Sequence, residues 1–286
     1  APEPRPELKY RPRKLSASGL GALIDNPYVA YAKYILKIFP LNELEKPMGA
    51  TDFGNIVHKV LEEFCCRYPQ ELPENAEEIM LNIGRKVFAD NNVDDDKMIF
   101  WRLRFKNVIK WVLEQEKEER LKLKDIYPEK EGKMTVDLPA GEFLLTSKAD
   151  RIDEYIDGSI EIIDYKTGSS VPSEKAVKNY KAPQLLLEAL IAQNKGFPDV
   201  VFDDVKAIKY WKLGEKIIEI NGKDLEDLLQ NGKQKIVEIL SKYDFENMPY
   251  AVNPSPKYCK NKEYDHLSRI SEWGINAKEE EDFEND

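Results

Sequence analysis

Two aspartates and a lysine in the middle of the 286-residue chain, Asp150, Asp164 and Lys166, have the types and spacing of a catalytic group. Residues 160–166 read Ile-Glu-Ile-Ile-Asp-Tyr-Lys, which predicts a strand, and side chains alternate faces along a strand. Asp164 and Lys166 therefore point the same way. Asp150, at the end of the preceding predicted strand, is placed to meet Asp164 across a hairpin. Buried charges are costly unless they are paired or bind a metal. Two carboxylates beside a lysine suit metal-assisted hydrolysis of a phosphodiester, and the alternative is an Asp–Lys ion pair on a solvated strand end.

A second candidate residue, His58, lies on a predicted helix over residues 51–64. Six apolar residues at helical spacing form the buried stripe of that helix, namely Phe53, Ile56, Val57, Val60, Leu61 and Phe64. His58 lies on the flank of this stripe, and Gly54, one turn earlier, leaves space beside it. The only other histidine is His266, near the end of the chain. His58 is therefore the one imidazole candidate for a metal in the first half, against the plainer interpretation of a surface residue.

The charge balance argues against a simple nucleic-acid binder without excluding one. The formal net charge is −10, and residues 277–286 contribute −5 of it through six acids and one lysine. Local basic patches, not net charge, determine phosphate contact. The most basic stretch is the Pro-rich opening, residues 1–14, which is either a solvated linker or a phosphate-contacting arm.

Cysteine content and hydropathy limit the metal clusters and the cellular location that the sequence allows. The three cysteines, Cys65, Cys66 and Cys259, form no C-x-x-C pair, so a zinc knuckle or a four-thiolate iron–sulfur cluster is not expected. Few cysteines, no signal peptide and no long apolar run predict a reducing, cytoplasmic location without a membrane partner. The chain begins with Ala, which we interpret as a fragment of a longer protein or a processed chain.

The order of predicted elements is helices, then antiparallel strands, a helix, and further strands. Ser16 or Ser18 caps a first short helix, and Asn26-Pro27 starts a second. Later helices are expected over 74–91, 94–121, 175–194 and 224–243, and strands over 121–126, 133–138, 143–152, 160–166, 205–213 and 216–220. Turn signals stand at Pro128, Gly132 and 139–141, and the charged run 114–120 reads as a solvated helix face. The fold class is therefore α+β (α/β), a mixed central sheet flanked by helices, with an N-terminal helical cluster.

The joint order of these motifs resembles the RecB-type PD-(D/E)XK nucleases. The matching pieces are Gly54 to His58 on a helix, Ala-Asp-Arg-Ile-Asp around Asp150, Asp164-Tyr-Lys166, and Gln184 on the following helix. The likeness covers residues 1–273, and its closer form is the C-terminal nuclease domain of the AddB subunit of bacterial AddAB helicase–nucleases. It implies a restriction-endonuclease-like core over 122–245. The remaining segments would be an arm (1–14), a helical subdomain carrying His58 (15–121), a wrapping segment (246–276) and an acidic disordered tail (277–286).

The resemblance also implies roles for individual residues. Asp150, Asp164, the Tyr165 carbonyl and His58 would bind Mg²⁺, with Mn²⁺ as an alternative. Lys166 would position the attacking water or stabilise charge, and Gln184 would orient Lys166 or the phosphate. Family members often carry Tyr four residues after the Gln; here that residue is Glu188, which weakens a DNA-contact role at this position.

The implied function is a metal-dependent DNA exonuclease domain that cleaves single-stranded or unwound DNA during double-strand break repair, beside an AddA-like helicase–nuclease partner. Two alternatives stay open. One is a stand-alone RecB-like exonuclease, and the other is a catalytically silent DNA-binding or scaffold domain. Arg151 and Asp153 carry less weight. Arg151 alternates away from Asp150 and is interpreted as a structural or a DNA-side contact, and Asp153 is interpreted as solvation at the strand end.

Overall fold

The computed structural model describes residues 1–39, 48–91, 93, 95–168, 171–256 and 264–273. The N-terminal part is helical apart from one short strand: η1 (Leu8–Tyr10), β1 (Lys14–Ser16), α1 (Ala17–Asp25), α2 (Pro27–Ala30), the π-helical η2 (Tyr31–Ile35), α3 (Ala50–Arg67), α4 (Ala76–Asp90), α5 (Asp95–Glu119) and η3 (Arg120–Lys122). The rest alternates: β2 (Leu123–Leu138), β3 (Gly141–Tyr155), β4 (Ser159–Lys166), α6 (Glu174–Lys178), α7 (Gln184–Gln193), β5 (Asp204–Lys212), β6 (Lys216–Asn221), α8 (Gly222–Lys242) and α9 (Asp265–Ser268).

A six-stranded mixed sheet forms the centre of the molecule, as the sequence predicts. The long strand β3 is antiparallel to β2 along nearly its whole length. Its first part is parallel to β1, and its second part is antiparallel to β4. Strand β4 is parallel to β5, which is antiparallel to β6. The parallel pair β4–β5 matters for function, because ligands of open α/β sheets bind beyond the carboxyl ends of such strands.

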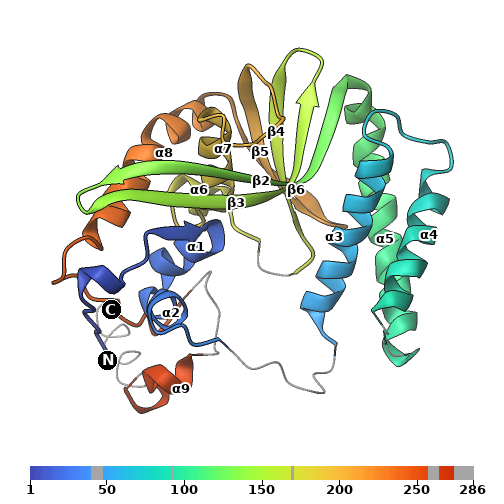
Figure 1. The fold of residues 1–286 in the computed structure, drawn as a ribbon. Coiled ribbons are helices and arrows are strands. Elements are labelled where there is room, and N and C mark those ends of the chain that lie inside the picture. Colours follow the sequence, from blue (N-terminus) through green and yellow to red (C-terminus); the bar gives the residue numbers. More distant parts are fainter. Residues whose placement is uncertain (40–47, 92, 94, 169–170, 257–263, 274–286) are drawn as a thin grey trace, which may run out of the picture.

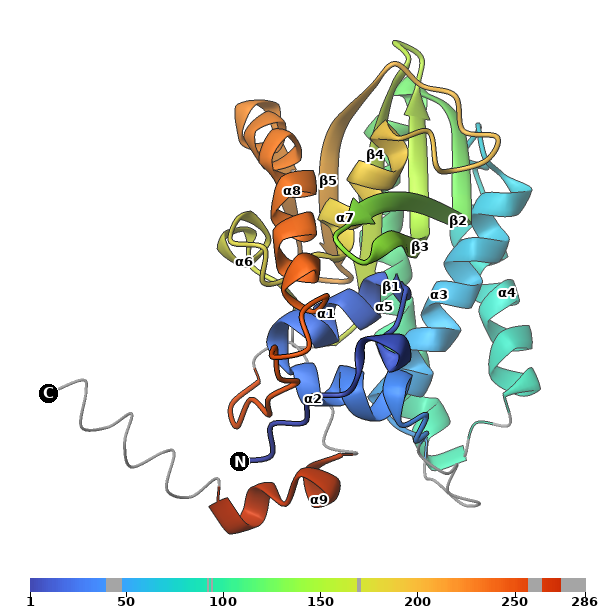
Figure 2. The same cartoon turned by 60° about the vertical axis from the view of Figure 1, so that its left-hand side comes forward.

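Two hydrophobic cores cover the two faces of the sheet (Figures 1 and 2). Helices α1, α7 and α8 pack on one face, and α3 and α5 pack on the other, with α4 against the outer side of α3 and α5. Strand β4 joins the cores by alternation: Ile160 and Ile162 belong to the first, and Ile163 and Tyr165 to the second. Each fully buried aliphatic side chain contributes about 1.5–3 kcal/mol. Both faces of β4 are therefore fixed, and Asp164 is fixed with them on the α7 side.

Two of the predicted turns are wrong. Pro128 and Gly132 lie inside β2, which is one strand rather than two. Gly132 stands there because of close packing: a Cβ at this position would lie 2.4 Å from the Phe197 ring. The predicted turn at 139–141 is confirmed, with Gly141 at φ +108°.

The predicted helix over 175–194 is divided into α6 and α7. Pro183 is the N-cap of α7, so Gln184 is the first residue of that helix. This places the Gln184 side chain at a helix end, beside the strands, instead of in the middle of a helix face.

The Pro-rich opening contacts the body of the protein. The Arg11 guanidinium is buried and donates to the backbone carbonyls of Pro6, Tyr243 and Glu246. Arg13 pairs with Asp244 at 2.5 Å, and Tyr250 N donates to Pro4 O. These two arginines therefore hold the opening segment against residues 243–246 of the body. The predicted tail over 277–286 and Cys259 lie outside the described residues.

Candidate metal and catalytic site

The candidate site forms where β3 and β4 separate. Their hydrogen-bonded ladder ends at Arg151 and Ile163. Just beyond the end of this ladder, the Tyr165 N–H donates to Asp150 Oδ2 at 2.8 Å. The Tyr165 ring points to the other face, where it packs against Trp211. Asp150 thus lies at the end of the ladder, and its carboxylate binds the Tyr165 main chain.

His58 reaches this point from α3. Its Nε2 lies 3.1 Å from the Tyr165 carbonyl oxygen, and its Nδ1 lies 3.5 Å from Asp150 Oδ2. Both neighbours are acceptors, so only a doubly protonated ring satisfies both. Burial lowers the pKa of His58, but the hydrogen bond to Asp150 and the negative charges of Asp150 and Asp164 together outweigh it and raise the pKa above its ordinary value. The Asp150 carboxyl correspondingly has a lowered pKa, since His58, the Tyr165 N–H and Lys166 together outweigh its own burial. His58, Asp150 and Tyr165 therefore offer an imidazole nitrogen, carboxylate oxygens and a carbonyl oxygen around one position, and this position favours a cation.

Lys166, Asp164 and Gln184 form a second group beside the first. The Lys166 ammonium lies 2.7–2.9 Å from the two Asp164 oxygens and donates to Gln184 Oε1 at 3.3 Å. Gln184 Nε2 donates to Asp164 Oδ1 at 2.5 Å. Lys166 Nζ lies 2.7 Å from Asp164 Oδ2, but the geometry of this contact is that of an ion pair without a hydrogen bond. Asp164 Oδ2 therefore has no hydrogen-bond donor. Burial raises the pKa of Asp164 to about 6 against the opposing effect of Lys166.

Glu188, one turn along α7 from Gln184, supports this second group. Its Oε1 accepts from Ser147 Oγ at 2.9 Å and lies 3.4 Å from Gln184 Nε2, while its Oε2 is buried without a partner. Burial, reinforced by the Asp164 charge, raises the pKa of Glu188 well above its ordinary value. Burial therefore favours the neutral form of Glu188, which lies behind the site and does not contact solvent.

Glu129 is a site residue that the sequence interpretation missed. It lies on β2 directly across from Asp150, and ligand atoms of His58, Glu129 and Asp150 all lie within 4.8 Å of one another. Among the described residues this trio is the group that meets a metal-ligand geometry. Glu129 has φ +52°, an uncommon conformation for a residue other than glycine, and such residues concentrate at functional sites. Its position between Pro128 and the misassigned turn at Gly132 hid it.

The donor set fits a hard divalent cation. Carboxylate and carbonyl oxygens with one imidazole nitrogen suit Mg²⁺ and Mn²⁺. Asp164 stands outside the trio, but its buried Oδ2 without a donor is the kind of atom that a cation or a solvent molecule satisfies. The predicted ligands His58, Asp150 and Tyr165 converge, and Asp164 lies next to them with Lys166 and Gln184.

The neighbouring charges on the opposite side of β3 form a different assembly, here named the α5 anchor: Glu116, Arg120, Arg151 and Asp153. Arg151 donates to Glu116 and to both oxygens of Asp153, and Arg120 donates to the second oxygen of Glu116 at 2.7 Å. All four side chains are buried. Arg151 is thus structural, as one of the two interpretations held. The predictions of a solvated face over 114–120 and of strand-end solvation for Asp153 are wrong at Glu116, Arg120 and Asp153, because Arg151 pairs with them.

This geometry agrees with the comparison to known families. The PD-(D/E)XK nuclease superfamily model matches residues 14–264. The chain belongs to the PD-(D/E)XK nuclease superfamily. The match includes every element that carries a residue of the site, from α3 to α7. The superfamily assignment and the mixed α/β fold are thereby confirmed, whereas the closer likeness to AddB belongs to the proposal below.

Individual relatives of this chain are longer proteins. One, from Rickettsia bellii (strain RML369-C), is 31% identical over 188 residues, which is 66% of this chain and 22% of the relative. Protein RC0550 of Rickettsia conorii is 30% identical over 190 residues, 65% of this chain and 23% of the relative. Both are named as uncharacterized proteins. The chain also matches the crystal structure of SSO0001 at 14% identity over 81% of this chain and 88% of that one, with a TM-score of 0.33, a likeness too weak to add to the assignment.

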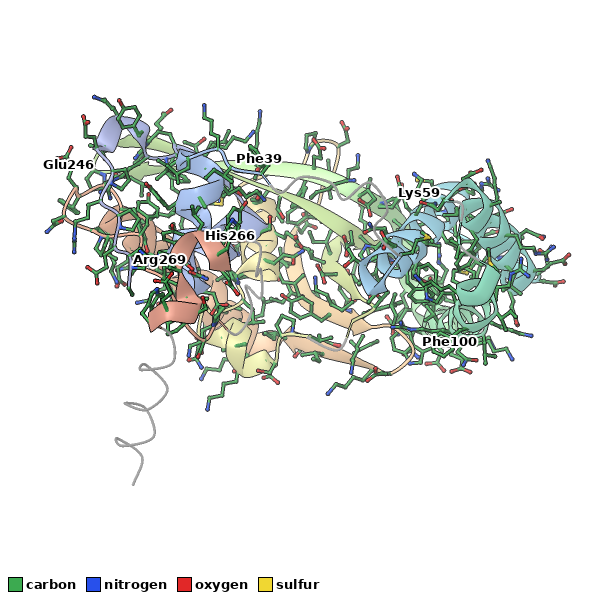
Figure 3. The ribbon with its side chains drawn as sticks, turned by 90° about the horizontal axis from the view of Figure 1, so that it is seen from below. Phe39, Lys59, Phe100, Glu246, His266 and Arg269 are labelled. Carbon is green, nitrogen blue, oxygen red and sulfur yellow. The ribbon has the colours of Figure 1, made fainter. Side chains whose placement is uncertain are left out.

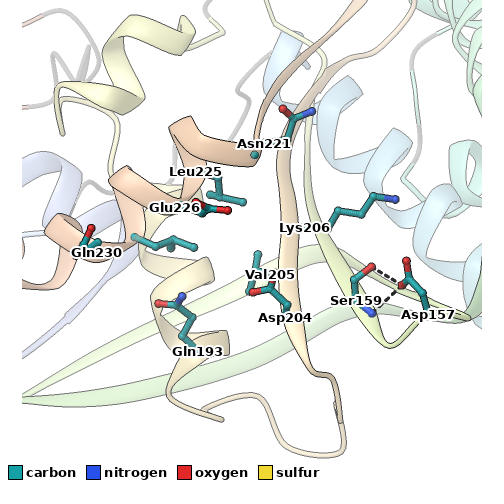
Figure 4. Close-up of a pocket in the computed structure, with 12 residues that line it drawn as sticks. Asp157, Ser159, Gln193, Asp204, Val205, Lys206, Asn221, Leu225, Glu226 and Gln230 are labelled. Carbon is teal, nitrogen blue, oxygen red and sulfur yellow. Dashed lines mark hydrogen bonds between the residues drawn. The ribbon is translucent and has the colours of Figure 1, made fainter.

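Other features of the described surface do not compete with this site. A hollow of about 800 Å³ lies at the opposite ends of β4 and β5, between the end of α7 and the start of α8 (Figure 4). Asp157 there accepts only from its neighbour Ser159, and the remaining lining is mixed. His266 lies in α9, far from Lys59 and hence from the His58 helix turn (Figure 3). Among the described helices, none has the length and apolar character that crossing a membrane requires.

Proposed function

We propose that this chain is a Mg²⁺- or Mn²⁺-dependent deoxyribonuclease domain that acts as an exonuclease on single-stranded DNA. The observation that carries the proposal is the convergence of His58, Asp150, Asp164 and Lys166 at the carboxyl end of β4, in a chain of the nuclease superfamily. His58, Asp150, Asp164 and the Tyr165 carbonyl would hold the metal, with Glu129 as a further ligand. A bound divalent metal lowers the pKa of water and neutralises charge on the scissile phosphate.

The protein's own groups then supply positioning and charge. Lys166, held between Asp164 and Gln184, presents an ammonium to the phosphate oxygens and stabilises the charge that develops on them. Gln184 accepts from Lys166 and so fixes its direction. Glu129 and Asp150 belong to different strands, so the register of β2 and β3 sets the spacing of the carboxylates.

A helicase-coupled role in break repair is the finer part of the proposal. The relatives extend far beyond the matched region, since this chain spans 22–23% of their length. A motor region in the longer protein, or an AddA-like partner, would deliver the unwound strand. The likeness of the sequence to AddB supports this arrangement.

The test is release of acid-soluble nucleotides from labelled single-stranded DNA with Mg²⁺ or Mn²⁺. We expect Lys166→Ala to lower the rate by about 10²-fold or more. Lys212→Ala is the matched control, because Lys212 is the register partner of Lys166 on β5 and pairs with Glu215 instead of with the site. Equal rates for wild type and Lys166→Ala, or no cleavage by wild type with either metal, would contradict the proposal.

A further inference from the structure

One face of the sheet leads away from the candidate site along β3. In the first part of β3, every second residue is buried in the core with α1 and α7, and the residues between share the opposite face, namely Leu144, Thr146, Lys148 and Asp150. The same alternation along β2 places Glu129 on that face together with Glu131 and Lys133. Two carboxylates of the candidate metal site are therefore the inner end of a strip of sheet surface, here named the open face.

A hollow of about 610 Å³ lies on the open face. Three strands line it: β2, β3, and the short β1, which pairs with the other edge of β3. Lys148 belongs to the hollow and to the surroundings of the site, because it lines the hollow and pairs with Glu129 at 2.5 Å. The hollow therefore adjoins the candidate metal site.

The charge of this lining is opposite in sign to that of the chain. The lining holds three lysines and one acid, Lys14, Lys133, Lys148 and Glu131, in a chain with a formal net charge of −10. Glu129 offsets Lys148, but neither Lys14 nor Lys133 forms an ion pair within the described part of the chain, and both are exposed. Two cations thus face Glu131 alone. A local surplus of this kind attracts anions whatever the net charge of the molecule.

The two lysines lie on either side of β3, at successive distances from the site. Lys133 on β2 is the register partner of Thr146, and Lys14 on β1 is that of Leu144. Thr146 and Leu144 precede Asp150 by four and six residues, which is about 13 and 20 Å of strand. Two residues of a strand and one nucleotide each add six bonds to their backbones, so an extended nucleic-acid strand along β3 brings one phosphate to about every second residue. The second and third phosphates beyond the metal therefore reach Lys133 and Lys14.

We propose that the open face binds the single-stranded DNA substrate through Lys133 and Lys14, at the second and third phosphates from the scissile bond. This rests on the proposed function and adds to it the path of the strand outside the site. A linear polyanion fits this face better than a single phosphate group, because the two lysines succeed one another along a line that ends at Asp150. The hydroxyl of Thr146, half-buried between β1 and β2, offers the same strand a neutral hydrogen-bond donor.

The test is fluorescence anisotropy of a 5′-fluorescein-labelled oligo(dT) 20-mer with the full chain in EDTA, where no metal supports cleavage. We expect Lys14→Ala combined with Lys133→Ala to raise Kd about tenfold at about 0.1 M salt, and to reduce the slope of log K against log salt by about 1.4, the value for two lost phosphate contacts on a single strand. Lys14→Arg combined with Lys133→Arg keeps both charges and should bind as wild type does. Lys223→Ala combined with Lys233→Ala is the matched control, because these exposed cations lie on α8, which packs on the other face of the sheet, and it should leave Kd and slope unchanged.

A second variant tests the same path without removing a lysine. Thr146→Glu puts a carboxylate on the open face, level with Lys133, and should also raise Kd about tenfold. Gln230→Glu adds the same charge to an exposed position of α8 and should have no effect.

Four outcomes would overturn the proposal. Wild type that does not bind the strand, or a Lys14/Lys133 alanine variant with unchanged Kd and slope, would show that the open face does not hold DNA. An equal loss of binding in the α8 control would show non-specific attraction. Displacement of the labelled strand by poly(Glu) as readily as by unlabelled oligo(dT) would assign the face to an acidic protein partner. Cleavage and its loss in Lys166→Ala are measured separately, so a chain that binds through these lysines without cleaving refutes the nuclease proposal and leaves this surface standing.

Discussion

The candidate site and the α5 anchor are two groups of buried charges on opposite sides of β3 and β4, and burial alone does not separate them. Asp164 and Arg151 are each 1% exposed. Hydrogen bonding does separate them. Every carboxylate oxygen of Glu116 and Asp153 in the α5 anchor accepts from an arginine, and two arginines balance two acids. One Arg120 nitrogen is the only anchor atom without a partner among the described buried atoms.

The site is unbalanced by comparison. Glu129, Asp150 and Asp164 face Lys166 and the half-exposed Lys148, so three acids meet two permanent cations, and His58 adds a third only while its ring is protonated. Within this group, Asp164 Oδ2 has no hydrogen-bond donor, although Lys166 Nζ lies 2.7 Å from it. Buried ionic groups are tolerated when their charges and lone pairs are matched. A group of buried charges in which every acceptor has a donor indicates a structural role. A group with acceptors left over indicates a place where a cation or substrate binds. Substitutions in the two groups should therefore have opposite effects on activity and stability.

The largest expected effect is on activity, from Asp164→Asn. The amide keeps the shape but removes the charge that pairs with Lys166, so we expect cleavage of single-stranded DNA to fall about 10²–10³-fold. Because burial raises the pKa of Asp164 to about 6, ionisation of this group at pH 7 disfavours the folded state. Asparagine removes that cost, and the urea midpoint at pH 7 should stay the same or rise. A rate within a few-fold of wild type, or a large fall in stability, would place Asp164 with the structural charges.

The second effect is on stability, from Arg151→Met. It leaves Glu116 and Asp153 buried without their shared cation, and we expect the free energy of unfolding to fall by about 3–5 kcal/mol. Urea denaturation followed by circular dichroism measures it. Lys235→Met removes an exposed pair with Glu238 on α8 and should leave the denaturation curve unchanged. If Arg151→Met unfolds at the wild-type midpoint, the α5 anchor does not hold α5 to the sheet.

Local patterns in the sequence predict the parts of the site that local structure determines. Alternation along 160–166 puts Asp164 and Lys166 on one face and Tyr165 on the other, as found. Helical spacing puts His58 on the flank of α3, and Pro183 starts α7 at Gln184. In each case a period of two or 3.6 residues, or a proline, carries the information.

The missed residues depend on contacts between distant parts of the chain. Glu129 reaches the site only because the β2–β3 register sets it across from Asp150, while Pro128 and Gly132 beside it signal a turn. Glu116 and Arg120 have the i, i+4 spacing of a surface pair, and nothing local shows that Arg151, 35 residues beyond Glu116, meets them under α5. Spacing alone cannot say which face of a helix receives a charged partner.

A smaller effect should come from Glu188, which supports the site without belonging to either group. The Gln184 nitrogen is directed to Asp164 and Glu188, so its oxygen faces Lys166. Glu188→Leu removes one acceptor and lets the amide turn, and we expect kcat to fall about tenfold with little change in KM. Glu188→Gln keeps an oxygen beside Ser147 and Gln184 and should restore most of kcat. Equal losses in Leu and Gln variants would show that packing, not the orientation of Gln184, explains the effect.

The smallest effect is a pH dependence that separates His58 from the carboxylates. The raised pKa of His58 means that its proton stabilises the metal-free fold below the ordinary imidazole pKa of about 6.5, and that this stabilisation is lost as pH rises through the higher folded pKa. A metal must displace that proton, so Mn²⁺ affinity measured by calorimetry without DNA should rise by up to about tenfold per pH unit below the folded pKa and level off above it. Asp150, with its lowered pKa, stays ionised throughout this range and contributes no slope. His58→Gln should therefore bind Mn²⁺ more weakly but with a flat profile between pH 7 and 8, above the range in which Asp164 titrates. If the slope survives in His58→Gln, the competing proton belongs to another group, and Asp164, whose burial raises its pKa to about 6, becomes the next to substitute.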